Sequence, residues 1–248
     1  MIGEPAVRPD WEIGAPRLLL PELIDLPAGS FRMGASADDK FATETERPAH
    51  RVTFSRSFAI GRYPVTVGEY RCYSPGHEPE IPESWPAVGV SWHDATAYCG
   101  WLAGVTGRPF RLPTEAEWEY ACRAGSVAAF ATGSDIGPAL ANYLYSEAGE
   151  RIGFGRRTPV GTYPPNSFGL HDLHGNVCEW VADAWHPNHA GASPDGAARL
   201  GARSARRVIR GGAWDHLPRL LRSAWRDALP PDARRDNVGF RLAASPEE

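Results

Sequence analysis

Short stretches rich in β-branched and aromatic residues alternate with polar stretches in the first 60 residues of the chain. This composition favours β-strands separated by turns and loops. We expect strands at 26–34, which the chain enters through a turn, and at 51–54 and 58–60. The polar stretch 35–49 predicts a loop between the first two of them.

Three helix starts are marked by capping boxes. In this pattern a Ser or Thr side chain accepts a hydrogen bond from the third residue of the helix, and the acid at that position reaches back to the cap. The three pairs are Thr66 and Glu69, Ser91 and Asp94, and Thr114 and Glu117. The second pair is followed by an apolar stripe at helical spacing, which predicts a helix that ends before Gly107.

The second half of the chain carries little helical pattern. Beyond Gly125 we expect short strands at 208–210 and 238–242, joined by long loops. The 26 glycines and 23 prolines also favour many irregular connections. The pattern predicts an α+β fold that is rich in loops, and 190–205 is the stretch best suited to a mobile excursion.

The length of 248 residues suits one large domain, which we expect at 23–248, preceded by an N-terminal arm at 1–22. The net charge of −4 is too small to favour nucleic acid or an anionic membrane as a partner. The apolar patch 18–24 is broken by Pro21 and Glu22, so it is too short to span a bilayer.

The four cysteines lie far apart and form no CxxC pair, which is typical of reduced, buried thiols. The first residues lack the basic and apolar regions of a secretory signal. We therefore expect a cytoplasmic protein, and a monomer. Among the 26 basic residues Lys40 is the single lysine, which we attribute first to coding bias and second to a preference for bidentate arginine pairing.

Eight short motifs occur in a fixed order along most of the chain. They are Met33-Gly34, Tyr63-Pro64-Val65-Thr66, Val90-Ser91-Trp92, 111–120, 166–170, Gly175-Asn176-Val177-Cys178-Glu179-Trp180, Arg210-Gly211-Gly212-Ala213-Trp214 and Gly239-Phe240-Arg241. The chain thereby resembles the formylglycine-generating enzyme (sulfatase-modifying factor) family, a branch of the C-type-lectin-like fold. The resemblance implies an α+β fold with two main helices beside small twisted antiparallel sheets and long loops.

The resemblance also implies structural calcium. By position its ligands would be the side chains of Asp172 and Glu179 and the backbone carbonyls of Gly175 and Val177. Hard oxygen donors on a flexible turn suit this ion. The alternative is that Glu179 pairs with an arginine. A second family site, from Asn142 and Tyr143 to Phe154, is less well matched, because Ile152 stands where an acid is expected.

The family's oxidases bind copper through two thiolates, since Cu(I) prefers sulfur. The corresponding positions in this chain are His216 and Leu221. Ala213 replaces the serine that follows the glycine pair, and Cys178 replaces a tryptophan. We therefore expect neither copper nor the oxidation of cysteine to formylglycine.

The altered region points to a binding module for a protein or peptide, whose surface we expect at 213–237. This segment mixes aromatic, arginine and aliphatic side chains, the types that anchor protein interfaces. The candidate contacts are Trp214, Asp215, His216, Leu217, Arg219, Leu220, Arg222, Trp225 and Asp227. The alternative is an ordinary loop.

The same segment resembles the variable C-terminal region of diversity-generating retroelement proteins, some of which use this fold. Those proteins vary by adenine-directed change of Asn codons, which could yield many of the residues found here, although not Trp225. The residues that could arise in this way are Asp215, His216, Leu217, Arg219, Leu220, Asp227, Ala228, Ala233, Arg235 and Asp236.

A second hypothesis keeps an enzyme and moves its metal. One cysteine with two or three histidines could hold iron, copper or zinc in a metal-dependent oxidoreductase that acts on a thiol or a small molecule. The candidates are Cys178, His171, His174, His186, His189 and His216. Hydrogen bonding is the plainer role for His174. We interpret Glu115 and Glu117 as acids that favour a helix N-terminus, not as catalytic groups.

Overall fold

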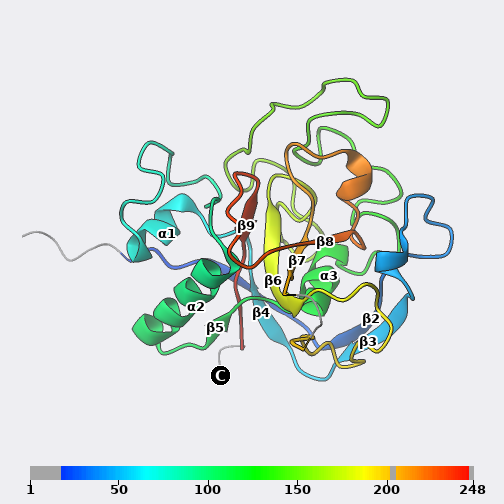
Figure 1. Cartoon of the computed structure of the whole chain (residues 1–248), viewed down its shortest axis with the longest axis horizontal. Helices are drawn as coiled ribbons and strands as arrows, with labels where there is room; N and C mark the ends of the chain where they lie inside the picture. The colour runs from blue at the N-terminus through cyan, green and yellow to red at the C-terminus, as the bar shows by residue number, and fades with distance from the viewer. Residues whose placement is uncertain (1–17, 202–204, 246–248) are drawn as a thin grey trace, which may run out of the picture.

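Three small β-sheets and three α-helices make up the regular part of the computed structural model, within the residues that it describes, 18–201 and 205–245 (Figure 1). Long loops connect these elements, above all between α3 and β6. The predicted α+β, loop-rich fold is confirmed. Most of the expected N-terminal arm and part of the stretch 190–205 lie outside the described residues.

The first sheet joins segments from both ends of the described chain. Its strands are, in order, β1 (Leu23–Leu26), β4 (Phe58–Gly61), β10 (Ala243–Ala244) and β5 (Phe110–Arg111), and every pair is antiparallel. Just before β1, the backbone N–H of Arg62 donates to the carbonyl of Glu22, and the two side chains form an ion pair.

The second sheet is the antiparallel pair β2 (Gly29–Met33) and β3 (His50–Phe54). The strand expected at 26–34 is therefore two strands, β1 and β2. They are separated at Pro27, which has no N–H to donate to a ladder. The expected strands at 51–54 and 58–60 are confirmed. The loop expected at 35–49 also holds a short 3₁₀ helix, η1 (Glu44–Glu46).

The third sheet forms the centre of the second half and was predicted only in part. Its order is β8 (Arg226–Leu229), β7 (Arg207–Arg210), β6 (Cys178–Ala184) and β9 (Val238–Phe240). Strands β6 and β9 are parallel, whereas the other pairs are antiparallel. A 3₁₀ helix, η2 (Pro218–Leu220), lies in the connection from β7 to β8.

The three predicted helices begin at the predicted caps. In α1 (Val67–Tyr73), α2 (Trp92–Thr106) and α3 (Glu115–Arg123) the cap side chain accepts from the third helical N–H. The apolar stripe of α2 is buried in a core cluster with Trp180 and Phe240. Helix α2 ends at Thr106, before the expected Gly107, whose φ of 74° suits a residue without a Cβ.

Helix α3 is tied to the third sheet by buried ion pairs. Both oxygens of Glu115 accept from Arg226 of β8, at 2.6 and 2.9 Å. Glu119 accepts from Arg210 of β7 at 2.6 Å and from Arg123 at 2.8 Å. Burial alone would raise the pKa of Glu115, but the neighbouring guanidinium groups lower it to about 2. Glu115 thus lies in the first turn of α3 as expected, but both of its oxygens also bind a buried arginine, a role that was not predicted.

A further buried pair joins β6 to the chain beyond β9. The carboxylate of Glu179 accepts from Arg241 at 2.6 and 2.7 Å and from the indole N–H of Trp118 at 2.7 Å. Arg241 also donates to the carbonyl of Gly61 at the end of β4. All three side chains are fully buried, so this pair links α3, the third sheet and the first sheet.

Replacing Arg241 by methionine tests how strongly this pair holds the fold. We expect Arg241→Met to lower the free energy of unfolding by about 3–5 kcal/mol, because Glu179 would remain buried without a counterion. Urea unfolding followed by tryptophan fluorescence measures the loss.

The matched control is Arg62→Met. Arg62 pairs with Glu22, and the two side chains are 32% and 57% exposed, so this change should cost at most about 1 kcal/mol. Equal losses in the two variants would contradict the structural role of the buried pair.

Candidate functional site

The segment that follows β7 carries the first group of predicted contacts. Trp214, His216, Leu217 and Leu220 are half-buried and Asp215 is exposed. The backbone is held in place, since the N–H of Trp214 donates to the carbonyl of Asn176 at 3.0 Å. These side chains therefore share one region of the surface around η2.

Other contacts in the segment are already committed to partners within the protein. Both oxygens of Asp215 accept from the side-chain amide of Asn237 at 3.0 Å. The backbone N–H and the guanidinium of Arg219 both donate to Glu147. Asp227 is exposed on β8, 4.0 Å from Arg206. Arg219 thereby brings the loop 144–150 against η2.

Two of the predicted surface contacts, Arg222 and Trp225, face the interior instead, so the prediction was wrong for them. Arg222 is 2% exposed and binds the carboxylates of Glu46 and Asp39 at 2.6–2.8 Å. Trp225 is 7% exposed and packs edge-on against His216 at 5.5 Å. Their arginine and aromatic character serves the core, so we leave both out of the candidate surface.

The positions that correspond to the copper thiolates hold no metal-binding pair. Leu221 is fully buried, and its methyl groups lie where Cβ atoms on Gly175 and Gly212 would approach to 3.0 and 2.9 Å. Two residues without a Cβ thus make room for an apolar side chain. Cys178 is 1% exposed, and burial raises the pKa of its thiol well above the usual range.

The expected calcium ligands are only partly available. Glu179 is engaged by Arg241 and Trp118, which is the alternative of pairing with an arginine. Asp172 accepts from the N–H of Gly161 at 2.8 Å and from the amide of Asn176 at 3.4 Å. Beside this network the side-chain oxygen of Asn142 is buried without a hydrogen-bond partner. The carboxylate of Glu179 is therefore committed to Arg241 and Trp118 instead of being free to hold a cation.

The candidate histidines of a moved metal site are dispersed. His174 has a backbone partner on each ring nitrogen, at Leu221 and Ala131, which supports the hydrogen-bonding role. His171 contacts the carbonyl of Tyr163. Within 18–201 and 205–245, no group of three or more His, Cys, Asp or Glu side chains is placed to hold a metal ion. The relocated metal site is therefore not favoured.

His189, one of the candidate metal ligands, is buried beside the ion pairs of α3. It is 3% exposed, and its Nε2 atom has no hydrogen-bond partner among the described residues. Burial lowers the pKa of His189 to about 4, so the ring is neutral at pH 7.

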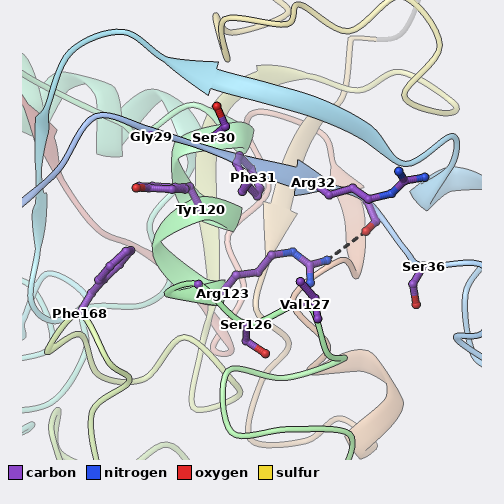
Figure 2. Close-up of a pocket in the computed structure, with 12 residues that line it drawn as sticks. Gly29, Ser30, Phe31, Arg32, Ser36, Tyr120, Arg123, Ser126, Val127 and Phe168 are labelled. Atoms are coloured by element: carbon purple, nitrogen blue, oxygen red, sulfur yellow. Dashed lines mark hydrogen bonds between the residues drawn. The ribbon is translucent and has the colours of Figure 1, made fainter.

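Two adjoining hollows open beside α3 and η2. The smaller, of about 340 Å³, is bounded by β2, α3 and Phe168. Figure 2 shows Arg123 of α3 reaching into it, where its guanidinium donates to the carbonyl of Gly34 at 3.0 Å. Ser36 and Val127 line both hollows, so the smaller one adjoins the larger.

The larger hollow is a cleft of about 880 Å³, within the size range of ligand sites in proteins. Its walls are the segments 36–41, 127–136 and 143–147, with Pro218 and Arg219 of η2 completing it. In Figure 1 these loops surround the orange η2. None of the first three walls was predicted from the sequence, and only the wall at 36–41 has a signal there, the acids of the loop 35–49.

Sequence comparison supports the resemblance. The model of the sulfatase-modifying factor enzyme 1-like domain matches residues 13–246. The formylglycine-generating enzyme of Mycobacterium tuberculosis is 30% identical, with 92% of this chain and 99% of that protein covered. The mouse protein named inactive C-alpha-formylglycine-generating enzyme 2 is also 30% identical, with 95% and 91% covered.

Solved structures share the fold. PvdO from Pseudomonas aeruginosa superposes with a TM-score of 0.83 at 38% identity, covering 91% of this chain and 94% of that one. Treponema denticola variable protein 1 gives a TM-score of 0.74 at 24% identity, covering 90% and 95%. At that identity the second likeness shows the fold alone. Together they confirm the expected C-type-lectin-like architecture.

The buried histidine makes a pH-dependent prediction. An unfolded histidine takes up a proton near pH 6.5, whereas His189 does so only near pH 4, so its contribution to stability is lost as the pH falls between these values. The unfolding free energy of wild type relative to His189→Gln should therefore drop by about 2 kcal/mol from pH 7 to pH 5. Urea titrations of both proteins at the two pH values measure it. A difference that does not change with pH would contradict the assignment.

Proposed function

The chain belongs to the family of sulfatase-modifying factor enzyme 1-like domains, and we propose that it is a non-oxidase member that binds a protein or peptide. The observation that carries the proposal is the replacement of both residues at the positions where the family's oxidases have copper-binding thiolates. At one position Leu221 is a fully buried apolar side chain, and at the other His216 stands in place of a thiolate. The name of the mouse relative records that the family also includes an inactive member.

The surface that supports binding surrounds η2 and leaves out the buried Arg222 and Trp225. It combines the half-buried Trp214, Leu217 and Leu220 with the exposed Asp215. Aromatic and aliphatic side chains beside a cleft are typical anchors of protein interfaces. Because the ordered backbone holds these side chains in place before binding, less ordering is required when a partner arrives.

A role as a variable protein of a diversity-generating retroelement is a finer version of this proposal. Most positions that an Asn codon could reach, including Asp215 and Arg235, are at least partly exposed. Ala228 is fully buried, so variation there would disturb the core. A reverse-transcriptase gene beside a repeat that matches residues 208–241 would support this version.

We keep a cytoplasmic, monomeric state as a prediction. In the parts of the chain that the structure describes, no helix is both long and apolar enough to cross a membrane.

Selection from a random peptide phage library tests the binding function. The wild-type protein should enrich related peptides, and Trp214→Ser with Leu217→Ser should weaken their binding at least tenfold, because both changes remove apolar contacts. Val105→Ser is the control, since Val105 is 51% exposed on α2, which contributes no residue to the cleft.

Catalytic activity with a bound redox metal would contradict the binding role. Stoichiometric binding of one redox metal by the purified protein, together with oxygen consumption on a thiol substrate, would restore the metal-dependent oxidoreductase. Metal analysis and an oxygen electrode distinguish the two functions.

We also propose structural calcium near Asp172, without Glu179 as a ligand. The unpartnered oxygen of Asn142 and the buried carboxylate of Asp172 support this. Calcium there would cross-link the loops that meet at this point. EDTA should lower the melting temperature of the wild-type protein, because an ion bound only by the folded state stabilises it. Asp172→Asn should show no shift on EDTA addition, and an unchanged wild-type melting temperature would contradict the proposal.

A further inference from the structure

The lining of the larger cleft carries four carboxylates and three basic side chains. The acids are Asp38, Asp39, Asp135 and Glu147, and the basic residues are Lys40, Arg219 and Arg222. The charge that the cleft offers to a ligand therefore depends on which of these groups are already paired.

The two arginines that line the cleft are already paired with carboxylates. Arg222 binds Glu46 and Asp39, and Arg219 binds Glu147. Both arginines are therefore neutralised by wall residues and offer no free charge to an incoming group. The ammonium of Lys40 lies over the ring of Phe41, 5.0 Å from its centroid.

Two carboxylates of the cleft have no cationic partner among the described residues. Asp38 and Asp135 are exposed residues of the lining, and their side chains accept hydrogen bonds from the neighbouring Ser36 and Ser134. Because both carboxylates line the cleft and are exposed, they attract a positive group that enters it.

Apolar and aromatic side chains also line the cleft. Phe41, Phe130, Ile136 and Tyr143 line the cleft, and Val127 at its rim is 86% exposed. Tyr143 is fixed by a hydrogen bond from its hydroxyl to the carbonyl of Ile136 at 3.2 Å. Rigid aromatic rings beside carboxylates suit a ligand that combines apolar side chains with positive charge.

We propose that the cleft binds a basic peptide segment in which arginine or lysine flanks aromatic or aliphatic side chains. This inference rests on the proposed function and names the chemistry of the partner. Pro218 and Arg219 belong both to the cleft and to the surface around η2, so one bound segment can touch both. Its positive groups meet Asp38 and Asp135, while its apolar side chains cover the rings.

Fluorescence anisotropy with three labelled peptides of equal length tests the inference. The first alternates arginine with tryptophan and phenylalanine, and the other two carry glutamate or glutamine in place of arginine. We expect the arginine peptide to bind at least tenfold more tightly than the others, with an affinity that falls as salt is raised from 50 to 500 mM. Over about this range of salt concentration, ions screen the attraction between the peptide and the carboxylates.

Matched variants locate the binding. Asp38→Asn combined with Asp135→Asn should weaken the arginine peptide about tenfold, because two exposed charge contacts are lost. Asp25→Asn combined with Glu80→Gln removes two exposed acids outside the cleft and should leave binding unchanged. Ser134→Trp, which narrows the opening, should weaken all peptides, and melting curves check that each variant is folded.

The outcomes separate this inference from the proposed function. If peptides bind whatever their charge, and only Trp214→Ser with Leu217→Ser weakens them, the basic ligand is wrong while the binding module stands. If the arginine peptide does not bind and the phage selection enriches acidic or neutral sequences, the inference is overturned in the same way. If no peptide binds and no sequence is enriched, both are overturned.

Discussion

The pairing of buried carboxylates with arginines is the constraint on which this structure depends. Glu115, Glu119 and Glu179 lie in the core, where an unpaired charge would be too costly to keep. Each is matched by a guanidinium from β7, β8 or the chain beyond β9. Because long loops separate the partners, these pairs determine how α3 lies against the third sheet. The bidentate geometry also gives the many arginines a structural use that lysine could not supply.

Local signals were readable in the sequence, whereas long-range pairing was not. The three helix caps depend on residues three positions apart, so the pattern was sufficient to place the helix starts. Strand β6 was missed because it is buried along nearly all its length and shows no alternation of polar and apolar residues. The role of Glu115 was missed because its partner, Arg226, is 111 residues away.

The candidate site shows the same difference between local features, which the sequence indicates, and long-range contacts, which it does not. The residue types of the segment 213–237 suggested an interface, and the structure places some of them on the surface around η2. Arg222 and Trp225 carry the same chemical signal but face inward, since residue type alone does not give the direction of a side chain. The cleft could not be predicted, because its walls come from segments that only the folded chain brings together.

The position of β10 has a consequence for how the chain reaches this fold. It lies between β4 and β5, and Arg241 just before it contacts Gly61 across 180 residues of sequence. The ends of this long intervening segment must meet before β10 can take its place between β4 and β5. The loss of chain entropy on closing so long a loop opposes this step. Topologies dominated by such distant contacts reach the native state slowly. The time spent with β4 and β5 unjoined therefore sets the interval during which their open edges are exposed to other chains.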